Sequence, residues 1–197
     1  MSTHLFSILF IAILVENYVS VQFLGICPFL GVYKKLDTSI GMSFAVIFVM
    51  VLATAVTWPI NHFILERYAL TYLQTLVFIL VIAALVQIVE TFLRRFIPAL
   101  YHALGIYLPL ITTNCIVLGV VILNVQRQYS FAESIVNSLG GGIGFLLAMF
   151  MFTGIRSKLD ESDIPHFFSG LPITLVAAGL AALSFQGFAG IAVNLFK

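Results

Sequence analysis

Cys27 and Cys115 are the residues of this chain best suited to carry chemistry. They are its only cysteines, they lie nearly half the chain apart, and each opens the same pattern, C-x-x-L-G-V. Thiolate sulfur is a soft ligand that selects zinc, Cu(I) or iron–sulfur clusters. One equivalent thiol from each half therefore indicates a shared metal site. A disulfide and a pair of inert buried thiols are the alternatives.

An iron–sulfur cluster takes four thiolates, and this chain offers two. A second subunit would have to complete such a site. A run of three polar residues, Thr112, Thr113 and Asn114, directly precedes the second cysteine. The histidines lack the paired spacing that haem ligation requires, so a membrane-embedded haem is not expected.

The carboxylate of Glu16 is a further candidate because it lies inside an apolar stretch. About 12 residues at roughly 1.5 Å each would place it well below the membrane surface. An ionisable group at that depth is a functional-site hypothesis by default. The alternatives are a position near the outer interface and a neutral, hydrogen-bonded carboxyl.

The elements that position these residues are expected to be membrane helices. Of the 197 residues, 61% are hydrophobic and only 9% are charged, and the mean hydropathy is +1.14. Soluble domains carry about a quarter charged residues, so the composition indicates an integral membrane protein. No basic run suggests nucleic acid as a partner. No soluble domain fits between the spans, so any soluble redox chemistry must belong to partner subunits.

Six stretches are long and apolar enough to cross about 30 Å of hydrocarbon as helices. They are residues 5–32, 39–62, 69–92, 100–124, 131–155 and 171–195. The prediction is thus an all-α, multi-pass membrane protein whose single domain covers residues 1–197. Six of the nine basic residues fall in the first, third and fifth connections. The positive-inside rule places these connections in the cytoplasm and both termini outside it.

The repeated cysteine pattern divides the chain into residues 1–97 and 98–197, with three spans each. Because three is odd, the second half enters the membrane in the opposite sense, which makes a 3+3 inverted-topology repeat. Pro28 and Pro109 predict that the first and fourth spans are broken helices. The repeat then brings Cys27 and Cys115 together in a dry, buried pocket. The pattern Gly140-x-x-x-Gly144 is typical of close helix packing.

Three segments resemble one family closely. They are FLGICPFLGV at Phe23–Val32, KKL at Lys34–Leu36, and GIYLPLITTNC at Gly105–Cys115. The chain resembles the A subunit of the Rnf complexes, the ion-translocating ferredoxin:NAD oxidoreductases. Its counterpart is the E subunit of the Na⁺-translocating NADH:quinone reductases. The resemblance extends over the whole chain.

The resemblance implies a site that the chain shares with a partner. In that family, the A subunit pairs with a homologous E subunit of opposite orientation, and each contributes two cysteines to a [2Fe-2S] cluster inside the membrane. Cys27 and Cys115 would be the two iron ligands of this chain, with Thr113 and Asn114 as candidates to hydrogen-bond the sulfurs. No catalytic residue and no complete active site are expected in the chain itself.

The resemblance also implies an electron-transfer role in the cell inner membrane. Further iron–sulfur clusters and flavins belong to other Rnf subunits (B, C, D and G), and electron flow drives Na⁺ or H⁺ movement. The motifs identify no coupling residue and do not distinguish the two ions. The alternative functions are a small secondary transporter and a structural scaffold subunit.

Overall fold

A computed structural model describes residues 2–27, 36–65, 67, 71–96, 114–162, 165, 167 and 170–195. The regular elements in these ranges are all helical, which confirms the all-α class for this part of the chain. The α-helices are α1 (Ser2–Phe10), α3 (Leu36–Ile60), α4 (Gln74–Phe96), α7 (Cys115–Gln126), α8 (Phe131–Asp160) and α9 (Leu171–Leu195). The π-helix η1 (Ile11–Val15) continues α1, the π-helix η2 (Asn61–Leu65) continues α3, and the 3₁₀-helix η3 (Thr71–Leu73) precedes α4.

Each of the six predicted stretches overlaps one of the α-helices. Three described segments are long and apolar enough to cross a membrane: Ser39–Leu65, Gln74–Thr91 and Phe131–Leu159. Three shorter apolar helices lie in the other stretches, at Leu5–Val15, Cys115–Gln126 and Pro172–Gly187. The described residues therefore show a helical membrane protein, and the count of six spans stays a prediction.

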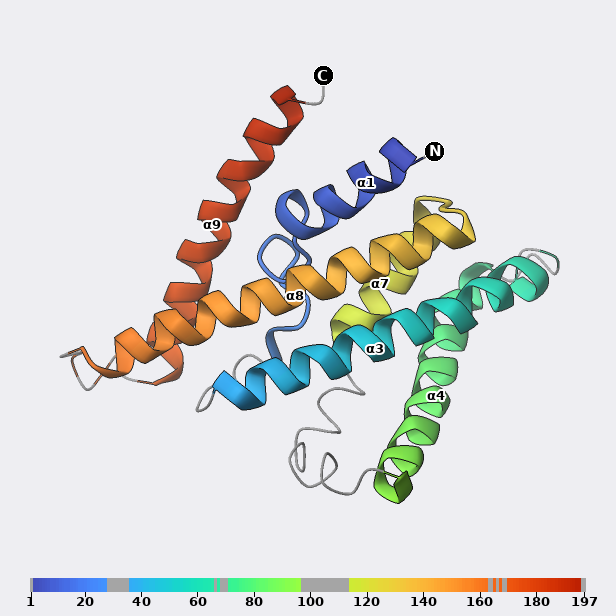
Figure 1. Ribbon diagram of the computed structural model, residues 1–197, viewed down its shortest axis with the longest axis horizontal. Helices are drawn as coiled ribbons and strands as arrows, with labels where there is room; N and C mark the ends of the chain where they lie inside the picture. Colours follow the sequence, from blue (N-terminus) through green and yellow to red (C-terminus); the bar gives the residue numbers. More distant parts are fainter. Residues whose placement is uncertain are drawn as a thin grey trace.

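Helices α3 and α8 form the centre of the fold and run antiparallel side by side (Figure 1). Helix α1 packs against α8, and α7 packs against both α3 and α8. Helix α4 departs from one end of the central pair and α9 from the other (Figure 1). The core lies where the central pair meets α7 and the first segment, with Met42, Val46, Val120 and Phe145 fully buried.

The glycine pattern of α8 is the surface on which the first helix packs. A Cβ atom on Gly140 would lie 2.9 Å from Ala12 Cβ and 3.2 Å from the carbonyl oxygen of Leu9. A Cβ atom on Gly144 would lie 3.2 Å from the carbonyl oxygen of Ala12. Only glycine lets two helix backbones approach this closely. The packing function predicted for Gly140-x-x-x-Gly144 is therefore confirmed.

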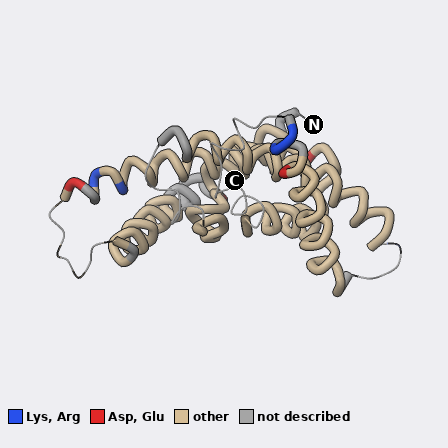
Figure 2. Tube along the Cα trace, turned by 90° about the horizontal axis from the view of Figure 1, so that it is seen from below, with Lys and Arg blue, Asp and Glu red and all other residues tan. Residues whose placement is uncertain are grey.

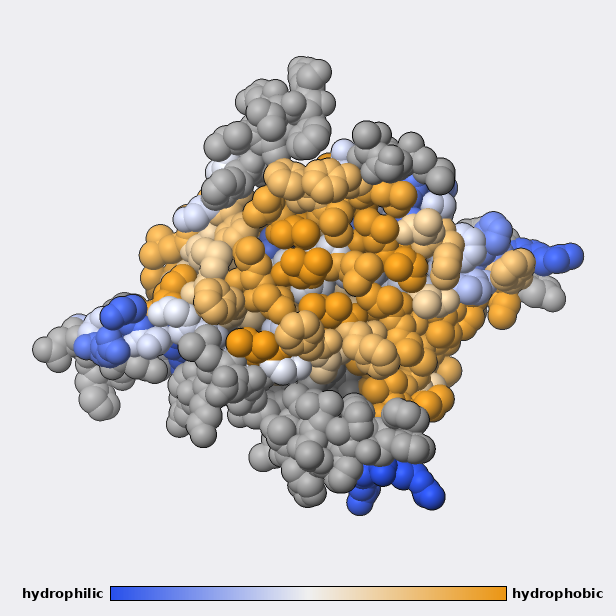
Figure 3. Space-filling view, viewed as in Figure 1, coloured by the Kyte–Doolittle hydropathy of each residue, from blue (hydrophilic) through white to orange (hydrophobic). Residues whose placement is uncertain are grey.

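Charge is scarce along the described trace. Lys, Arg, Asp and Glu occupy a few short stretches, and the long helices are otherwise uncharged (Figure 2). One face of the molecule is covered by apolar side chains, with polar residues at its edges (Figure 3). Exposed large hydrophobic side chains include Phe44, Phe48, Leu80, Phe150 and Leu183. In a membrane protein such side chains meet lipid or another apolar subunit.

Candidate functional site

The first predicted stretch loses its helical backbone before it reaches its cysteine. The helix η1 ends at Val15, residues 16–25 form turns, and a short helical turn contains Ile26 and Cys27. Gly25 has a φ of +87°, in the left-handed region that favours glycine. The chain therefore changes direction immediately before Cys27. Pro28 lies outside the described residues.

Asn17 attaches this irregular segment to the central helix α8. Its Oδ1 accepts hydrogen bonds from the backbone N–H groups of Val19 and Ser20, at 3.1 and 3.3 Å. Its Nδ2 donates to the carbonyl oxygen of Gly144 at 2.9 Å, across the close packing of η1 on α8. The side chain is fully buried, so one amide both shapes the turn and fixes its position.

The second cysteine is the first residue of α7. Asn114 is the N-cap, and its Oδ1 accepts a hydrogen bond from the Ile116 N–H at 3.3 Å. The N-terminus of a helix carries free N–H groups and a partial positive charge, which together favour an anion such as a thiolate. Pro109 and Thr113 lie outside the described residues, so the predicted break of the fourth span is untested.

The two cysteine segments contact each other. The backbone N–H of Gly25 donates a hydrogen bond to Cys115 Sγ, with 3.0 Å between nitrogen and sulfur. Leu24 packs against Gly119, where a Cβ atom would come within 2.5 Å of Leu24 Cδ1. Gly119 belongs to the second C-x-x-L-G-V pattern, so this glycine makes room for the first cysteine segment.

Both cysteines are free, so this structure holds no disulfide between them. Cys115 is partly buried and Cys27 is exposed. The expectation that both lie in a buried pocket is therefore wrong for Cys27 in the single chain, because the irregular segment carries it to the molecular surface. Among the described residues, no three His, Cys, Asp or Glu side chains gather as a metal site would require.

One buried donor beside the cysteines has no partner. Asn114 is 3% exposed, and its Nδ2 makes no hydrogen bond within the part of the chain that the structure describes. The amide lies next to Gly25, whose Cβ position is 3.4 Å from Asn114 Oδ1. Buried polar groups are nearly always hydrogen-bonded, so an amide unpaired among the described residues points to an acceptor outside them.

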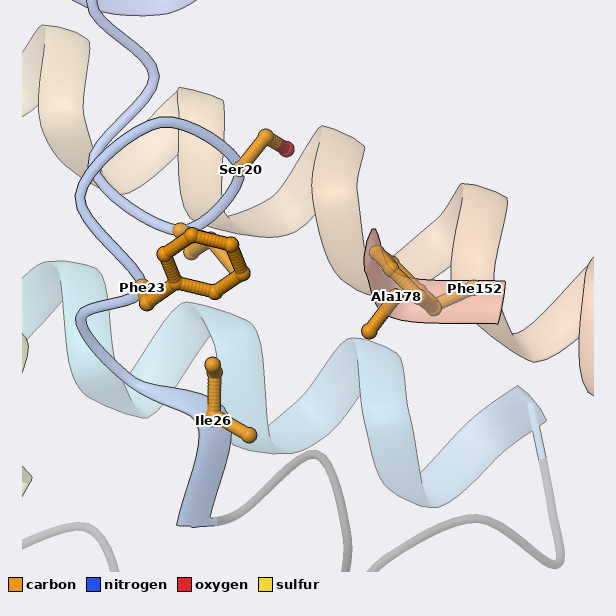
Figure 4. Close-up of a pocket in the computed structure, with 6 residues that line it drawn as sticks. Ser20, Phe23, Ile26, Phe152 and Ala178 are labelled. Carbon is orange, nitrogen blue, oxygen red and sulfur yellow. The ribbon is translucent and has the colours of Figure 1, made fainter. Parts of the chain in front are cut away.

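A small cavity of about 10 Å³ lies beneath the irregular segment (Figure 4). Phe23 and Ile26 line it from the segment, and Phe152 of α8 and Ala178 of α9 line it from the helices. Its volume is at the lower limit for one water molecule. The Ser20 hydroxyl, also in the lining, is buried without a partner among the described residues.

A chain of buried polar side chains joins the irregular segment to three helices, and sequence reasoning missed it. Tyr18 donates to Asn137 Oδ1 at 3.0 Å, and Asn137 donates to Asn124 Oδ1 at 2.6 Å. Asn124 donates to Ser138 Oγ at 3.3 Å, and that hydroxyl lies 2.7 Å from Thr54 Oγ1. Asparagine side chains in otherwise apolar stretches were the sequence signal that could have indicated these buried hydrogen bonds.

The geometry of these hydrogen-bonded side chains indicates that they hold the helices in register. Each amide oxygen among them accepts a hydrogen bond, and each amide nitrogen donates one. One member, Asn124, also lines a larger cavity of about 490 Å³ at the α7–α8 turn, together with Trp58, His62 and Gln128.

Glu16 forms an ion pair with Arg127, the residue that ends α7. The sequence left open whether Glu16 is a deep functional carboxylate, lies near the outer interface or is a neutral, hydrogen-bonded carboxyl, and it did not identify Arg127 as a partner. The first helix ends at Val15, and Glu16 meets the connection between α7 and α8. Arg127 also donates to the Tyr129 hydroxyl at 3.4 Å. The pair joins the two halves of the chain.

We expect the Glu16–Arg127 pair to contribute modestly to stability. The side chains are 37% and 29% exposed, and such pairs are worth at most about 1 kcal/mol. Glu16→Gln, Arg127→Gln and the double variant form a cycle whose coupling can be measured from thermal midpoints in detergent. The Lys158–Glu161 pair, at 83% and 67% exposed, is the control. A coupling no larger than that of the control pair would contradict a structural function for Glu16.

Comparison with known proteins gives consistent matches over nearly the whole chain. Residues 5–192 match the family described as Rnf-Nqr subunit, membrane protein. The chain is 53% identical to the A subunit of the ion-translocating oxidoreductase complex of Syntrophotalea carbinolica, over 95% of this chain and 97% of the relative. It is 54% identical to the A subunit of the Na⁺-translocating ferredoxin:NAD⁺ oxidoreductase complex of Acetobacterium woodii, over 91% and 93%. It is 51% identical to the A subunit of the ion-translocating oxidoreductase complex of Pectobacterium atrosepticum, over 94% and 97%.

Proposed function

This chain belongs to the Rnf-Nqr family of membrane protein subunits, and on that premise we propose that it is the membrane electron-transfer subunit of an ion-translocating ferredoxin:NAD oxidoreductase. The names of its relatives support the complex. The observation that carries the electron-transfer function is the contact between the two cysteine segments, in which the Gly25 N–H donates to Cys115 Sγ. The contact supports a site to which both cysteine segments contribute.

The residues present fit half of the ligand set of a [2Fe-2S] cluster. Both thiols are free, and Cys115 stands at a helix N-terminus that favours a thiolate. A backbone N–H already donates to its sulfur, and the unpaired Asn114 amide lies beside that bond. The exposure of Cys27 leaves one side of the site open to ligands from another chain. When bound, such a cluster supplies one-electron transfer.

Each residue of the site has a definite task in this proposal. Cys27 and Cys115 bind iron and supply two of the four thiolates. Gly25 allows the chain to turn and directs its N–H to the sulfur. Leu24, packed on Gly119, holds the first segment against α7. The apolar side chains around the core exclude water from the protein side of the site.

The partners follow from the incomplete ligand set. A homologous E subunit of opposite orientation would supply the other two cysteines. The B, C, D and G subunits would carry the flavins and the further iron–sulfur clusters. Electron flow through the cluster would be coupled to Na⁺ or H⁺ movement across the cell inner membrane. One relative is named as Na⁺-translocating, which supports the ion-translocating function without deciding the ion for this chain.

The inverted repeat of residues 1–97 and 98–197 remains part of the proposal. The antiparallel pair of α3 and α8 supports it, because these helices contain the second span of each half (Figure 1). Helix α4 follows α3 and helix α9 follows α8, and the two depart from opposite ends of the α3–α8 pair (Figure 1). A three-span unit and its inverted copy would produce this arrangement.

The excess of basic residues in the odd-numbered connections predicts that both termini lie outside the cytoplasm. An alkaline phosphatase fused to the C-terminus should therefore be active, and a fluorescent protein that folds only in the cytoplasm should stay dark. Fusions after Arg156 should give the opposite pattern and serve as the control. A fluorescent C-terminal fusion would show that the orientation is the reverse of the predicted one, and it would not contradict the inverted repeat.

The proposed function is tested by purifying the chain together with its partner subunits. The complex should show the visible and electron paramagnetic resonance (EPR) spectra of a [2Fe-2S] cluster in addition to the signals of its other centres. The chain expressed alone should bind little or no iron, because half of the ligands are missing. A complex that turns over without an intramembrane cluster would instead support a scaffold function. Ion transport by the isolated chain would support a secondary transporter.

A further inference from the structure

We propose that Asn114 is a positioning residue for the cluster, donating a hydrogen bond from Nδ2 to sulfur at the Cys27–Cys115 site. Together with the Gly25 N–H it would raise the reduction potential of the cluster. This inference rests on the proposed function and extends it to a residue that controls the energy of the electron-transfer step.

The two ends of the Asn114 amide have different tasks. Oδ1 caps α7 by accepting from the Ile116 N–H. Nδ2 has no partner within the described residues, although the side chain is only 3% exposed. Serine and aspartate cap helices as well as asparagine does, and neither would bury an unpaired NH₂ group here. Capping therefore does not account for an asparagine at this position.

The amide is also in the right place. Asn114 precedes Cys115 directly, and its Oδ1 lies 3.4 Å from the Cβ position of Gly25. The Gly25 nitrogen lies 3.0 Å from Cys115 Sγ. The buried amide and the sulfur thus flank the same glycine. Sulfur acceptors of a bound cluster would complete the hydrogen bonding of an amide that the described residues leave incomplete.

Hydrogen bonds to the sulfurs of a cluster affect its potential in a known direction. The reduced cluster carries one more negative charge, so donors stabilise it more than the oxidised form and raise the potential. The Gly25 donor is a backbone group that substitution does not remove. A side chain at Gly25 would also meet Phe145 at 3.1 Å and a φ of +87°. Asn114 is therefore the donor that can be tested.

The decisive variant is Asn114→Ser in the complete complex. Serine keeps an oxygen to cap α7 and removes the NH₂ group. An EPR-monitored redox titration should move the midpoint of the intramembrane cluster to more negative potential. A tenfold change in the reduction equilibrium would appear as about 59 mV for a one-electron couple. Ser130→Asn exchanges the N-cap of α8 at the other end of the α7–α8 hairpin, and it should leave the midpoint unchanged.

A measurement on the unaltered complex keeps the inference testable if the variant fails to assemble. Asparagine labelled with ¹⁵N at Nδ2 should produce a nitrogen hyperfine coupling to the reduced cluster in pulsed EPR. Asn114→Ser, where it assembles, should abolish that coupling. An unchanged midpoint with a full cluster signal, or an unaltered complex without the coupling, would overturn the inference. A complex without any intramembrane cluster would overturn the proposed function itself, which is a distinct result.

Discussion

Replacing either cysteine with serine is expected to remove the [2Fe-2S] signal from the assembled complex and to stop electron flow through it. Cys27→Ser and Cys115→Ser each leave three thiolates where the cluster takes four. The two cysteines open equivalent patterns and occupy contacting segments, so the two losses should be equally complete. This is the largest effect that the structure predicts for single substitutions.

The measurement combines EPR spectroscopy of the purified complex with two activity assays. Turnover from donor to natural acceptor should fall to background. Electron transfer from the peripheral site to an artificial acceptor should persist, because that site lies on other subunits. Thr153→Ser is a suitable control, since its hydroxyl donates to the Met149 carbonyl of its own helix. A complex that lacks either thiol but keeps a full cluster signal and full turnover would reduce the repeated cysteine pattern to a packing feature.

A valine at Gly140 is expected to displace the first helix from α8 and to destabilise the fold. Even a Cβ atom at this position would lie 3.2 Å from the Leu9 carbonyl oxygen and 2.9 Å from Ala12 Cβ. One of these two atoms, the Leu9 oxygen, belongs to the backbone, which cannot move aside as a flexible side chain can. Overpacking of this kind typically costs about 1–3 kcal/mol. The displacement should extend to the cysteine site, because Asn17 ties the irregular segment to Gly144 of the same helix face.

The same helix provides a matched control. Gly154 has no atom within 4 Å of its Cβ position, so Gly154→Val introduces the same side chain into α8 without a clash. Thermal midpoints in detergent and the rate of proteolysis within residues 16–27 should separate the two variants. Gly140→Val should melt earlier and be cleaved faster there. Equal behaviour of the two variants would show that α1 does not depend on close packing at Gly140.

The sequence by itself determined the class of the protein and its candidate reactive groups. Hydropathy and charge are local properties, so each long helix of the described residues overlaps one of the predicted stretches. The two C-x-x-L-G-V patterns identified both thiols, and Gly140-x-x-x-Gly144 identified a packing face that the structure confirms. Family membership followed from short contiguous motifs, and the comparisons show it over residues 5–192.

Only the tertiary structure decided which polar side chains have hydrogen-bond or ion-pair partners, and which residues those partners are. Glu16 acquires Arg127 as its partner, and Asn137 acquires Tyr18 and Asn124, through contacts between distant segments that no local pattern encodes. The end of the first helix at Val15 was also not predicted from the sequence. No local pattern in the sequence indicates that Nδ2 of Asn114 has no hydrogen-bond partner among the described residues. A hydrogen bond forms only when the fold brings a donor and an acceptor together, whereas hydropathy is a property of each residue by itself.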